Sequence, residues 1–326
     1  MTGSNGLALN KKGGWDRIVF IMFGLVVGGM ISPISKFWWE AEEEDGFSLP
    51  PLIQESETTN SSSVSTAQPS PTFNLPGPNL THVIVIASYF GANQQKVMRD
   101  LLSKQHEVRD TVLPGSPFGK MILVDNSSPL GPEVERLCSE YGIEYTRNED
   151  TDNGFQRELG AWRWAVKKVL PRLPLYDDSI IYFLQDSMLA RSMMRYPPPQ
   201  GLRATRVFYF EGGKWIPINS WVDIGARAMK NVKDAPPFDV QKIRSGKDVF
   251  NGMFGPNFIA TWNFTRTMEK RGVFDMLQVK RKLDEEATER ILGWFLSHDV
   301  GDDNAIGGHF QRPVTAPLFQ KFYQGR

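Results

Sequence analysis

The sequence predicts an α/β fold, in which helices flank a mostly parallel central sheet, with a transmembrane helix and a disordered stem before it. Short apolar runs that alternate with helical patterns predict the sheet. A long uncharged run near the N-terminus predicts the membrane helix. The chain has 326 residues, with 37 basic and 37 acidic side chains. It is therefore long enough for a large core and has no net charge to attract nucleic acid. Its single cysteine, Cys138, excludes an internal disulfide framework.

The membrane helix is predicted over residues 18–39. Residues 18–35 carry no charge, and at about 1.5 Å per residue a helix of this length spans roughly the hydrocarbon core of a bilayer. Basic residues precede the run and acidic residues follow it, so the positive-inside rule places the N-terminus in the cytosol. The alternatives are a cleaved signal peptide and a buried core helix. The length of the run and the absence of a clear cleavage site favour the anchor.

A stem follows over residues 40–80. This stretch is rich in Ser, Thr, Pro and acids and has no sustained apolar period, so it cannot bury enough surface to fold. Two Asn-x-Ser/Thr motifs lie in or beside it, at Asn60 and Asn79, and two more follow at Asn126 and Asn263. In a eukaryotic chain, the two stem motifs are the predicted glycosylation acceptors.

The catalytic domain is predicted over residues 81–310, followed by a C-terminal tail, 311–326. Its first half, 81–190, alternates four strands with three helices. The predicted strands are His82–Ser88, Met121–Val124, Ile143–Thr146 and Ile180–Leu184, and the predicted helices are Gln94–Lys104, Glu133–Tyr141 and Phe155–Val169.

The fourth predicted strand ends in Gln185-Asp186-Ser187, which makes Asp186 the first candidate site residue. Ligands of open α/β sheets bind where the carboxyl ends of the strands emerge, so an acid at that edge suits a binding role. The alternative is that Asp186 caps a turn after the strand.

The second half, 191–310, is predicted to build the acceptor side. Val207–Phe210 is expected to be a strand, and the glycines and aromatics of Phe250–Phe258 suit a loop over a sugar ring, although each aromatic could instead belong to the core. Helices are predicted over Thr261–Arg271 and Lys282–Ser297. Four residues of the second helix form one apolar face: Ile291, Leu292, Trp294 and Phe295.

Residues 81–310 resemble a GT-A glycosyltransferase of the family-2 kind. The resemblance implies that Ser88 and Tyr89, at the end of the first strand, lie near the nucleotide. Asp125, in Val124-Asp125-Asn126-Ser127-Ser128, resembles the acid that contacts uracil or ribose. The resemblance adds two residues near the donor, Asn153 and Gly154. Apart from the resemblance, a basic residue such as Arg157 or Arg191 is expected to pair with phosphate and so to substitute for the charge of a metal ion.

The strand that ends in Asp186 corresponds to the one that carries an Asp-x-Asp motif in that family, but here only one acid is present. The motif holds a divalent cation, Mn²⁺ or Mg²⁺, that neutralises the diphosphate leaving group. The resemblance implies Asp186 and His309 as metal ligands. The alternative for His309 is an ordinary loop residue.

The Glu-Arg-Ile-Leu-Gly segment resembles the acidic motif that supplies the catalytic base in these enzymes. Glu289 is the predicted base and Glu286 the reserve, because an inverting transfer needs one carboxylate to deprotonate the acceptor hydroxyl. The alternatives are an exposed acidic helix face and a base among Asp299, Asp302 and Asp303.

These patterns together predict a single-pass type II membrane glycosyltransferase of the Golgi, with a lumenal catalytic domain, a nucleotide-sugar donor and a glycan or glycoconjugate acceptor. The first alternative is a membrane-tethered carbohydrate-binding module that lacks turnover. The second is a hydrolase or nucleotidyltransferase, which the absence of Gly-x-Ser-x-Gly and P-loop motifs disfavours.

Overall fold

A computed structural model describes residues 79–112, 119–150, 157–211, 218–301 and 319–321. The chain divides into two units, Met1–Thr72 and Phe73–Arg326, and all the described residues belong to the second. The predicted cytosolic tail, the membrane helix 18–39 and the stem up to residue 78 lie outside the described residues. Within the described ranges, every helix is too short or too polar to cross a membrane.

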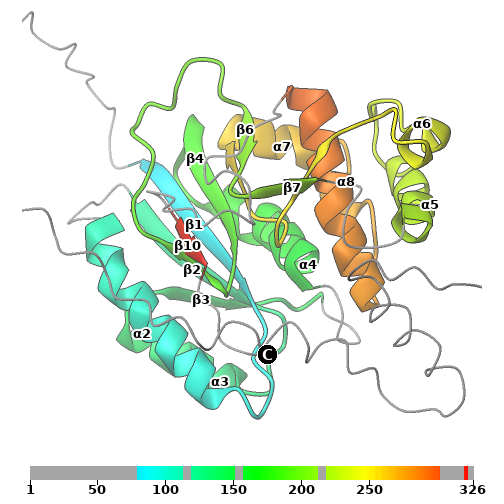
Figure 1. Ribbon diagram of the computed structural model, residues 1–326. Coiled ribbons are helices and arrows are strands. Elements are labelled where there is room, and N and C mark those ends of the chain that lie inside the picture. Colours follow the sequence, from blue (N-terminus) through cyan, green and yellow to red (C-terminus); the bar gives the residue numbers. More distant parts are fainter. Residues whose placement is uncertain (1–78, 113–118, 151–156, 212–217, 302–318, 322–326) are drawn as a thin grey trace, which may run out of the picture. The chain divides into compact units, whose positions relative to one another are not determined.

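A six-stranded sheet of mixed direction forms the centre of the fold (Figure 1). The strand order is β3-β2-β1-β4-β9-β6. The first four of these strands are parallel, and the antiparallel β9 joins them to β6. The bounds are β1 Leu80–Ser88, β2 Gly119–Asp125, β3 Glu144–Arg147, β4 Leu175–Gln185, β6 Ala204–Arg206 and β9 Phe258–Thr261.

The helices and the remaining strands complete the domain. The first three helices are α2 Gln95–Val112, α3 Gly131–Glu140 and α4 Arg157–Trp164, the last continued by a π-helical turn, Ala165–Val169, and a 3₁₀ turn, Leu170–Arg172. The later helices are α5 Ile218–Met229, α6 Val240–Arg244, α7 Trp262–Lys270, a 3₁₀ turn Val273–Asp275, and α8 Lys282–Val300. Two small antiparallel ladders pair β5 Met188–Ala190 with β10 Phe319–Lys321, and β7 Tyr209–Glu211 with β8 Asn251–Met253.

The sheet is buried on both faces, which is why its central strands are apolar at successive positions. In β1, Val83 and Val85 face a core that includes residues of α4, α5, α7 and α8. Ile84 and Ile86 face a second core, on the side of α2 and α3. The prediction of an α/β fold with a mainly parallel sheet is confirmed, including the alternating order from β1 to β4.

The structure differs from the sequence-based expectation at several elements. The antiparallel strands β6 and β9 were not predicted. The predicted strand Val207–Phe210 is wrong in its first two residues, which form a bend between β6 and β7. The predicted helix Phe155–Val169 changes to a π-helical turn at Ala165. The expectation that Phe250–Phe258 covers a sugar ring is wrong for its end residues. Phe250 and Phe258 are 5% and 0% exposed and belong to the core.

The chain reverses its direction across the sheet between β1 and β4. From β1 it moves to β2 and β3 on one side, then crosses back to β4 on the other side of β1. Such a switch point leaves a crevice at the carboxyl ends of the two strands, because the connections that leave them run in opposite directions. The carboxyl ends of β1 and β4 are therefore where a ligand site is expected.

Candidate functional site

Three of the predicted site residues stand in one row at the carboxyl edge of the sheet. The register pairs Ser88 of β1 with Asp125 of β2, and Ala87 with Gln185 of β4. Asp186 follows level with Ser88, and its backbone N–H donates to the carbonyl of Ala87 over 3.0 Å. The structure therefore brings Ser88, Asp125 and Asp186 to one edge of the sheet, as the sequence predicts.

Asp186 lies against the turn that follows β1. Its Oδ2 accepts a hydrogen bond from the backbone N–H of Tyr89 over 3.3 Å. Asp186 is 4% exposed, whereas the neighbouring Tyr89 is 46% exposed. The carboxylate at the end of β4 thus contacts the backbone of an exposed aromatic residue at the switch point.

Asp125 ties together the elements around it. Its carboxylate accepts from the backbone N–H of Ser128 at 3.2 Å, from the Ser128 hydroxyl and from the Tyr145 hydroxyl at 3.0 Å. Ser128 Oγ in turn accepts from the backbone N–H of Phe90 over 2.8 Å. Asp125 is only 1% exposed. Through these hydrogen bonds the Asp125 carboxylate links the end of β2 to β3 and to the turn that follows β1.

Gln185 points to the opposite face of the sheet from Asp186, because successive side chains of a strand alternate. Its Nε2 donates to Glu158 Oε1 over 2.7 Å, and its backbone N–H donates to Asn257 Oδ1 over 2.6 Å. Glu158 lies in the first turn of α4 and is 7% exposed. These buried polar groups join the end of β4 to α4 and to the loop between β8 and β9.

The loop between β8 and β9 reaches α8 because two glycines let β8 approach that helix closely. A Cβ on Gly293 of α8 would lie 2.6 Å from the carbonyl oxygen of Asn251 and 2.6 Å from Cα of Gly252. Glu289 is one turn before Gly293, so both residues lie on the same helix face. The backbone N–H of Gly255 donates to Glu289 Oε1 over 3.0 Å.

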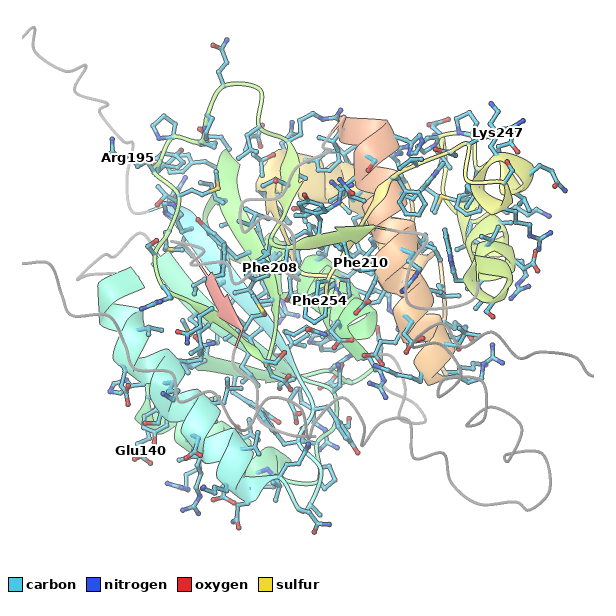
Figure 2. The ribbon with its side chains drawn as sticks, viewed as in Figure 1. Glu140, Arg195, Phe208, Phe210, Lys247 and Phe254 are labelled. Carbon is cyan, nitrogen blue, oxygen red and sulfur yellow. The ribbon has the colours of Figure 1, made fainter. Side chains whose placement is uncertain are left out.

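Residues near β7 and β8 also pack against one another and against α8. The backbone N–H of Phe254 donates to the carbonyl of Phe208 over 3.1 Å, and these two residues lie next to each other in Figure 2, with Phe210 beside α8. The guanidinium of Arg290 lies 4.9 Å from the centre of the Phe210 ring. Arg290 is thus a buried cation immediately after Glu289 in the chain.

Glu289 combines a raised pKa with partial access to solvent. Burial raises the pKa of Glu289 to about 8, and the nearby cations of Arg290 and Lys282 offset this only in part. The side chain remains 17% exposed. Its carboxyl can therefore change protonation state near neutral pH. In the ionised form it can accept a proton from a ligand, as a general base does, and it can then pass that proton to solvent.

Glu285 lies one turn before Glu289 and faces the start of α4. It forms ion pairs with Arg157 and, over 3.1 Å, with Lys282. Burial and then the charge of Glu158 raise the pKa of Glu285. The Arg157 side chain is 32% exposed, and its backbone has φ of 38°, a left-handed conformation that is uncommon for a residue with a side chain.

Four predicted site residues remain: three lie outside the described residues, and the fourth is Glu286 of α8. Asn153, Gly154 and His309 lie outside the described residues. Glu286, the reserve base, is partly buried on α8, where its carbonyl oxygen accepts from Arg290.

Three residues that link β4 to the surroundings of Glu289 were not predicted from the sequence: Gln185, Glu158 and Gly255. The position of Gln185, next to Asp186 at the end of a strand, was the one signal that could have indicated it. Neither the burial of Glu158 nor the contact of Gly255 with Glu289 has a local sequence signal.

The described residues cover the predicted metal site only in part, because His309 lies outside them. In the ranges that the structure covers, no three His, Cys, Asp or Glu side chains are grouped so as to hold a cation. Of the two predicted metal ligands, the structure describes only Asp186. Its Oδ2 accepts a hydrogen bond from the backbone N–H of Tyr89.

Two cavities lined by described residues lie away from Asp186 and Glu289. One, of about 420 Å³, is at the amino end of β4, between Asp177 and Asn263. The other, of about 640 Å³, lies beside β3 and is lined by Arg147, Trp164 and Lys168 among others.

No family model and no curated protein matches the sequence. Among solved structures, core-mannan synthase A from Aspergillus fumigatus, in its Mn/GDP form, is 12% identical and has a TM-score of 0.37; the match covers 67% of this chain and 70% of that one. Glucosyl-3-phosphoglycerate synthase from Mycobacterium tuberculosis, in complex with Mn²⁺ and UDP-glucose, is 13% identical with a TM-score of 0.32, covering 74% and 86%. Superpositions at these scores do not define an activity, so the proposal below depends on the side chains of this chain.

Proposed function

We propose that this protein is a glycosyltransferase of the GT-A kind, which transfers a sugar from a nucleotide-sugar donor to a glycan or glycoconjugate acceptor with inversion. The proposal is supported above all by the environment of the Glu289 carboxyl. This carboxyl combines a pKa of about 8 with partial exposure, and it lies beside the loop that packs on the end of β4. An inverting transfer requires a single base of this kind.

Four of the described residues have a role in the proposed reaction. Glu289 takes the proton of the acceptor hydroxyl, and the acceptor oxygen forms a bond to the anomeric carbon. The bond from that carbon to the phosphate oxygen breaks, and the nucleoside diphosphate leaves with the electron pair. Arg157 pairs with the phosphates, since a guanidinium matches phosphate oxygens in geometry and charge. Asp186 and Tyr89 bind the donor at the switch point.

The divalent cation, Mn²⁺ or Mg²⁺, remains a prediction, with Asp186 and His309 as its proposed ligands. We also retain the proposal of a type II Golgi membrane protein whose catalytic domain is lumenal. Its support is the uncharged run within residues 18–39 and the charge difference across it.

The test is turnover of a panel of nucleotide sugars by the full chain in detergent, with and without Mn²⁺. We expect at least one donor to be hydrolysed or transferred, and the variant Asp186→Ala to lose that activity. Full turnover by Asp186→Ala would contradict the site assignment. Binding of free glycan without any response to nucleotide diphosphates would instead favour the carbohydrate-binding module.

A further inference from the structure

The four Asn-x-Ser/Thr motifs of the chain have different surroundings in the fold. Asn60 lies outside the described residues, and Asn79 directly precedes β1. Asn126 and Asn263 both lie inside the folded domain. The structure can therefore distinguish these two, which the sequence alone treats as equivalent.

Asn126 cannot carry a glycan in the folded domain. It is 5% exposed, and both ends of its amide are engaged. Its Nδ2 donates to the carbonyl of Arg157 over 2.7 Å, and its Oδ1 accepts from Asn148 Nδ2 over 2.9 Å. A sugar on Nδ2 would displace the start of α4 from the end of β2.

Asn263 is exposed, in the first turn of α7. The helix is capped before it by Thr261, whose hydroxyl accepts from the backbone N–H of Phe264 over 3.3 Å. The third residue of the motif, Thr265, is fully buried and donates to the carbonyl of Thr261 over 2.9 Å. An enzyme that reads the Thr265 hydroxyl must therefore act before α7 packs onto the sheet.

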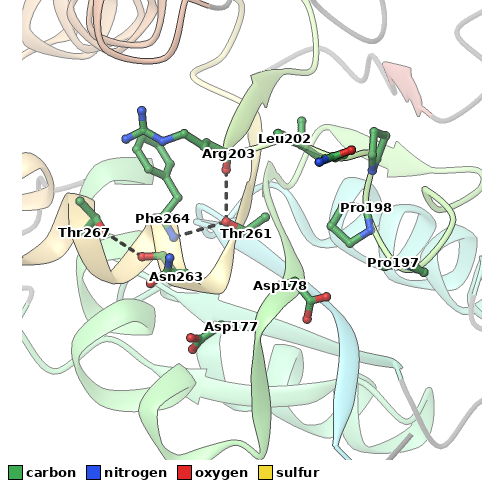
Figure 3. Close-up of a pocket in the computed structure, with 13 residues that line it drawn as sticks. Asp177, Asp178, Pro197, Pro198, Leu202, Arg203, Thr261, Asn263, Phe264 and Thr267 are labelled. Atoms are coloured by element: carbon green, nitrogen blue, oxygen red, sulfur yellow. Dashed lines mark hydrogen bonds between the residues drawn. The ribbon is translucent and has the colours of Figure 1, made fainter. Parts of the chain in front are cut away.

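The surroundings of Asn263 have space for a sugar. Figure 3 shows Asn263 at the wall of the cavity of about 420 Å³, together with Asp177, Arg203 and Thr267. The cavity walls combine these polar groups with a run of prolines, Pro197 to Pro199. Such a mixture of hydrogen-bonding groups and flat apolar surface suits a pyranose ring.

The cavity is also far from the proposed active site. Asp177 lines the cavity and Gln185 lies at the site, eight residues later on β4. At about 3.3 Å per residue these positions are about 26 Å apart. A glycan on Asn263 therefore leaves the carboxyl edge of the sheet open.

We propose that Asn263 carries an N-linked oligosaccharide, with its first sugar in the cavity between Asp177 and Thr267. Nδ2 of Asn263 forms a bond to the anomeric carbon of an oligosaccharide that is carried on a lipid diphosphate. The bond from that carbon to the phosphate oxygen breaks, the lipid diphosphate leaves with the electron pair, and the amide loses one proton to a base of the modifying enzyme. The inference depends on the lumenal topology of the proposed function, but not on transferase activity.

The test uses the full chain, expressed in a eukaryotic host, in which Asn60→Gln and Asn79→Gln remove the two motifs in or beside the stem. Electrophoretic mobility is compared before and after treatment with an amidase that removes N-linked glycans. On this background, Asn263→Gln removes the proposed site and Asn126→Gln serves as the matched control. Thr265→Ser keeps the motif and the buried hydroxyl, which separates loss of the motif from a disturbance of α7.

We expect the background protein to lose one glycan on amidase treatment, Asn126→Gln and Thr265→Ser to behave in the same way, and Asn263→Gln to show no change. An amidase-sensitive shift that persists in Asn263→Gln would overturn the proposal. So would the absence of any shift in the background protein. Transferase activity is measured on the same samples, and its presence without a shift at Asn263 would reject the glycan while keeping the proposed function.

Discussion

Gly255 and Glu289 are joined by a hydrogen bond of 3.0 Å from the backbone N–H of the glycine to Oε1 of the glutamate. Gly255 has φ of 59°, and a Cβ at this position would overlap the side-chain amide of Gln185. The glycine is thus the shared neighbour of the residue before Asp186 and of the proposed base. This relationship couples the donor edge of the sheet to α8.

Glu289→Gln should lower kcat by roughly 10²–10⁴-fold, because an amide cannot accept the proton of the acceptor hydroxyl. In the wild-type protein, kcat should rise with pH up to about 8, as the Glu289 carboxyl loses its proton. Steady-state rates across pH 5 to 9 check both expectations. Glu286→Gln is the matched control on the same helix, and an equal or larger loss in that variant would transfer the role of base to Glu286.

The free energy of unfolding should also depend on Glu289. Its pKa is about 8 in the folded protein and near 4.5 in the unfolded chain, so between these values the folded state binds more protons. The stability that protonated Glu289 contributes is therefore fully present below pH 4.5 and is lost as pH rises to about 8. Urea unfolding at several pH values should show a weaker decline in Glu289→Gln than in the wild type. Equal declines in both proteins would contradict the raised pKa.

Gly255→Ala should destabilise the fold more than Gly201→Ala. Both glycines have a positive φ, which costs a residue with a Cβ about 1 to 2 kcal/mol. At Gly201 no atom lies within 4 Å of the added Cβ, whereas at Gly255 the Gln185 amide must move, which adds about 1 to 3 kcal/mol. Urea unfolding midpoints measure the difference. If the two variants are equally stable, Gly255 is not packed as described.

Cys138 should be inert to alkylation in the native protein. Its side chain is 0% exposed in the core on the side of α2 and α3, and burial raises the pKa of the thiol to about 12. The thiolate is the reactive form, so iodoacetamide at pH 8 should modify Cys138 only when the domain opens. Mass spectrometry across a urea series should show labelling that follows unfolding. Complete labelling of the folded protein would place Cys138 outside the core.

The four parallel strands could be predicted because their signal is local. Three of them, β1, β2 and β4, contain a short apolar run that ends in polar residues, and β4 shows this most clearly at Gln185 and Asp186. The exception is β3, whose four residues include only one apolar side chain, Tyr145. The strand β9 escaped prediction because it has only four residues, Phe258–Thr261, and its antiparallel pairing with β4 depends on residues about 80 positions away.

The site was predictable where a strand end fixes a residue, as for Ser88, Asp125 and Asp186. The position of Glu289 depends on how closely β8 approaches α8, and that approach is permitted by Gly252 and Gly293. Close packing of this kind is a property of the assembled fold and leaves no periodic pattern. The burial of Glu158 beside Gln185 was hidden for the same reason.

The most direct test of the account is the initial rate at which the full chain releases nucleoside diphosphate from its preferred nucleotide sugar, compared between the wild type, Asp186→Ala and Glu289→Gln. Circular dichroism and the unfolding midpoint verify that the variants are folded. The account predicts that both folded variants lose at least a hundredfold of the rate. Wild-type rates in both variants, or no release from any nucleotide sugar by the wild-type chain, would contradict it.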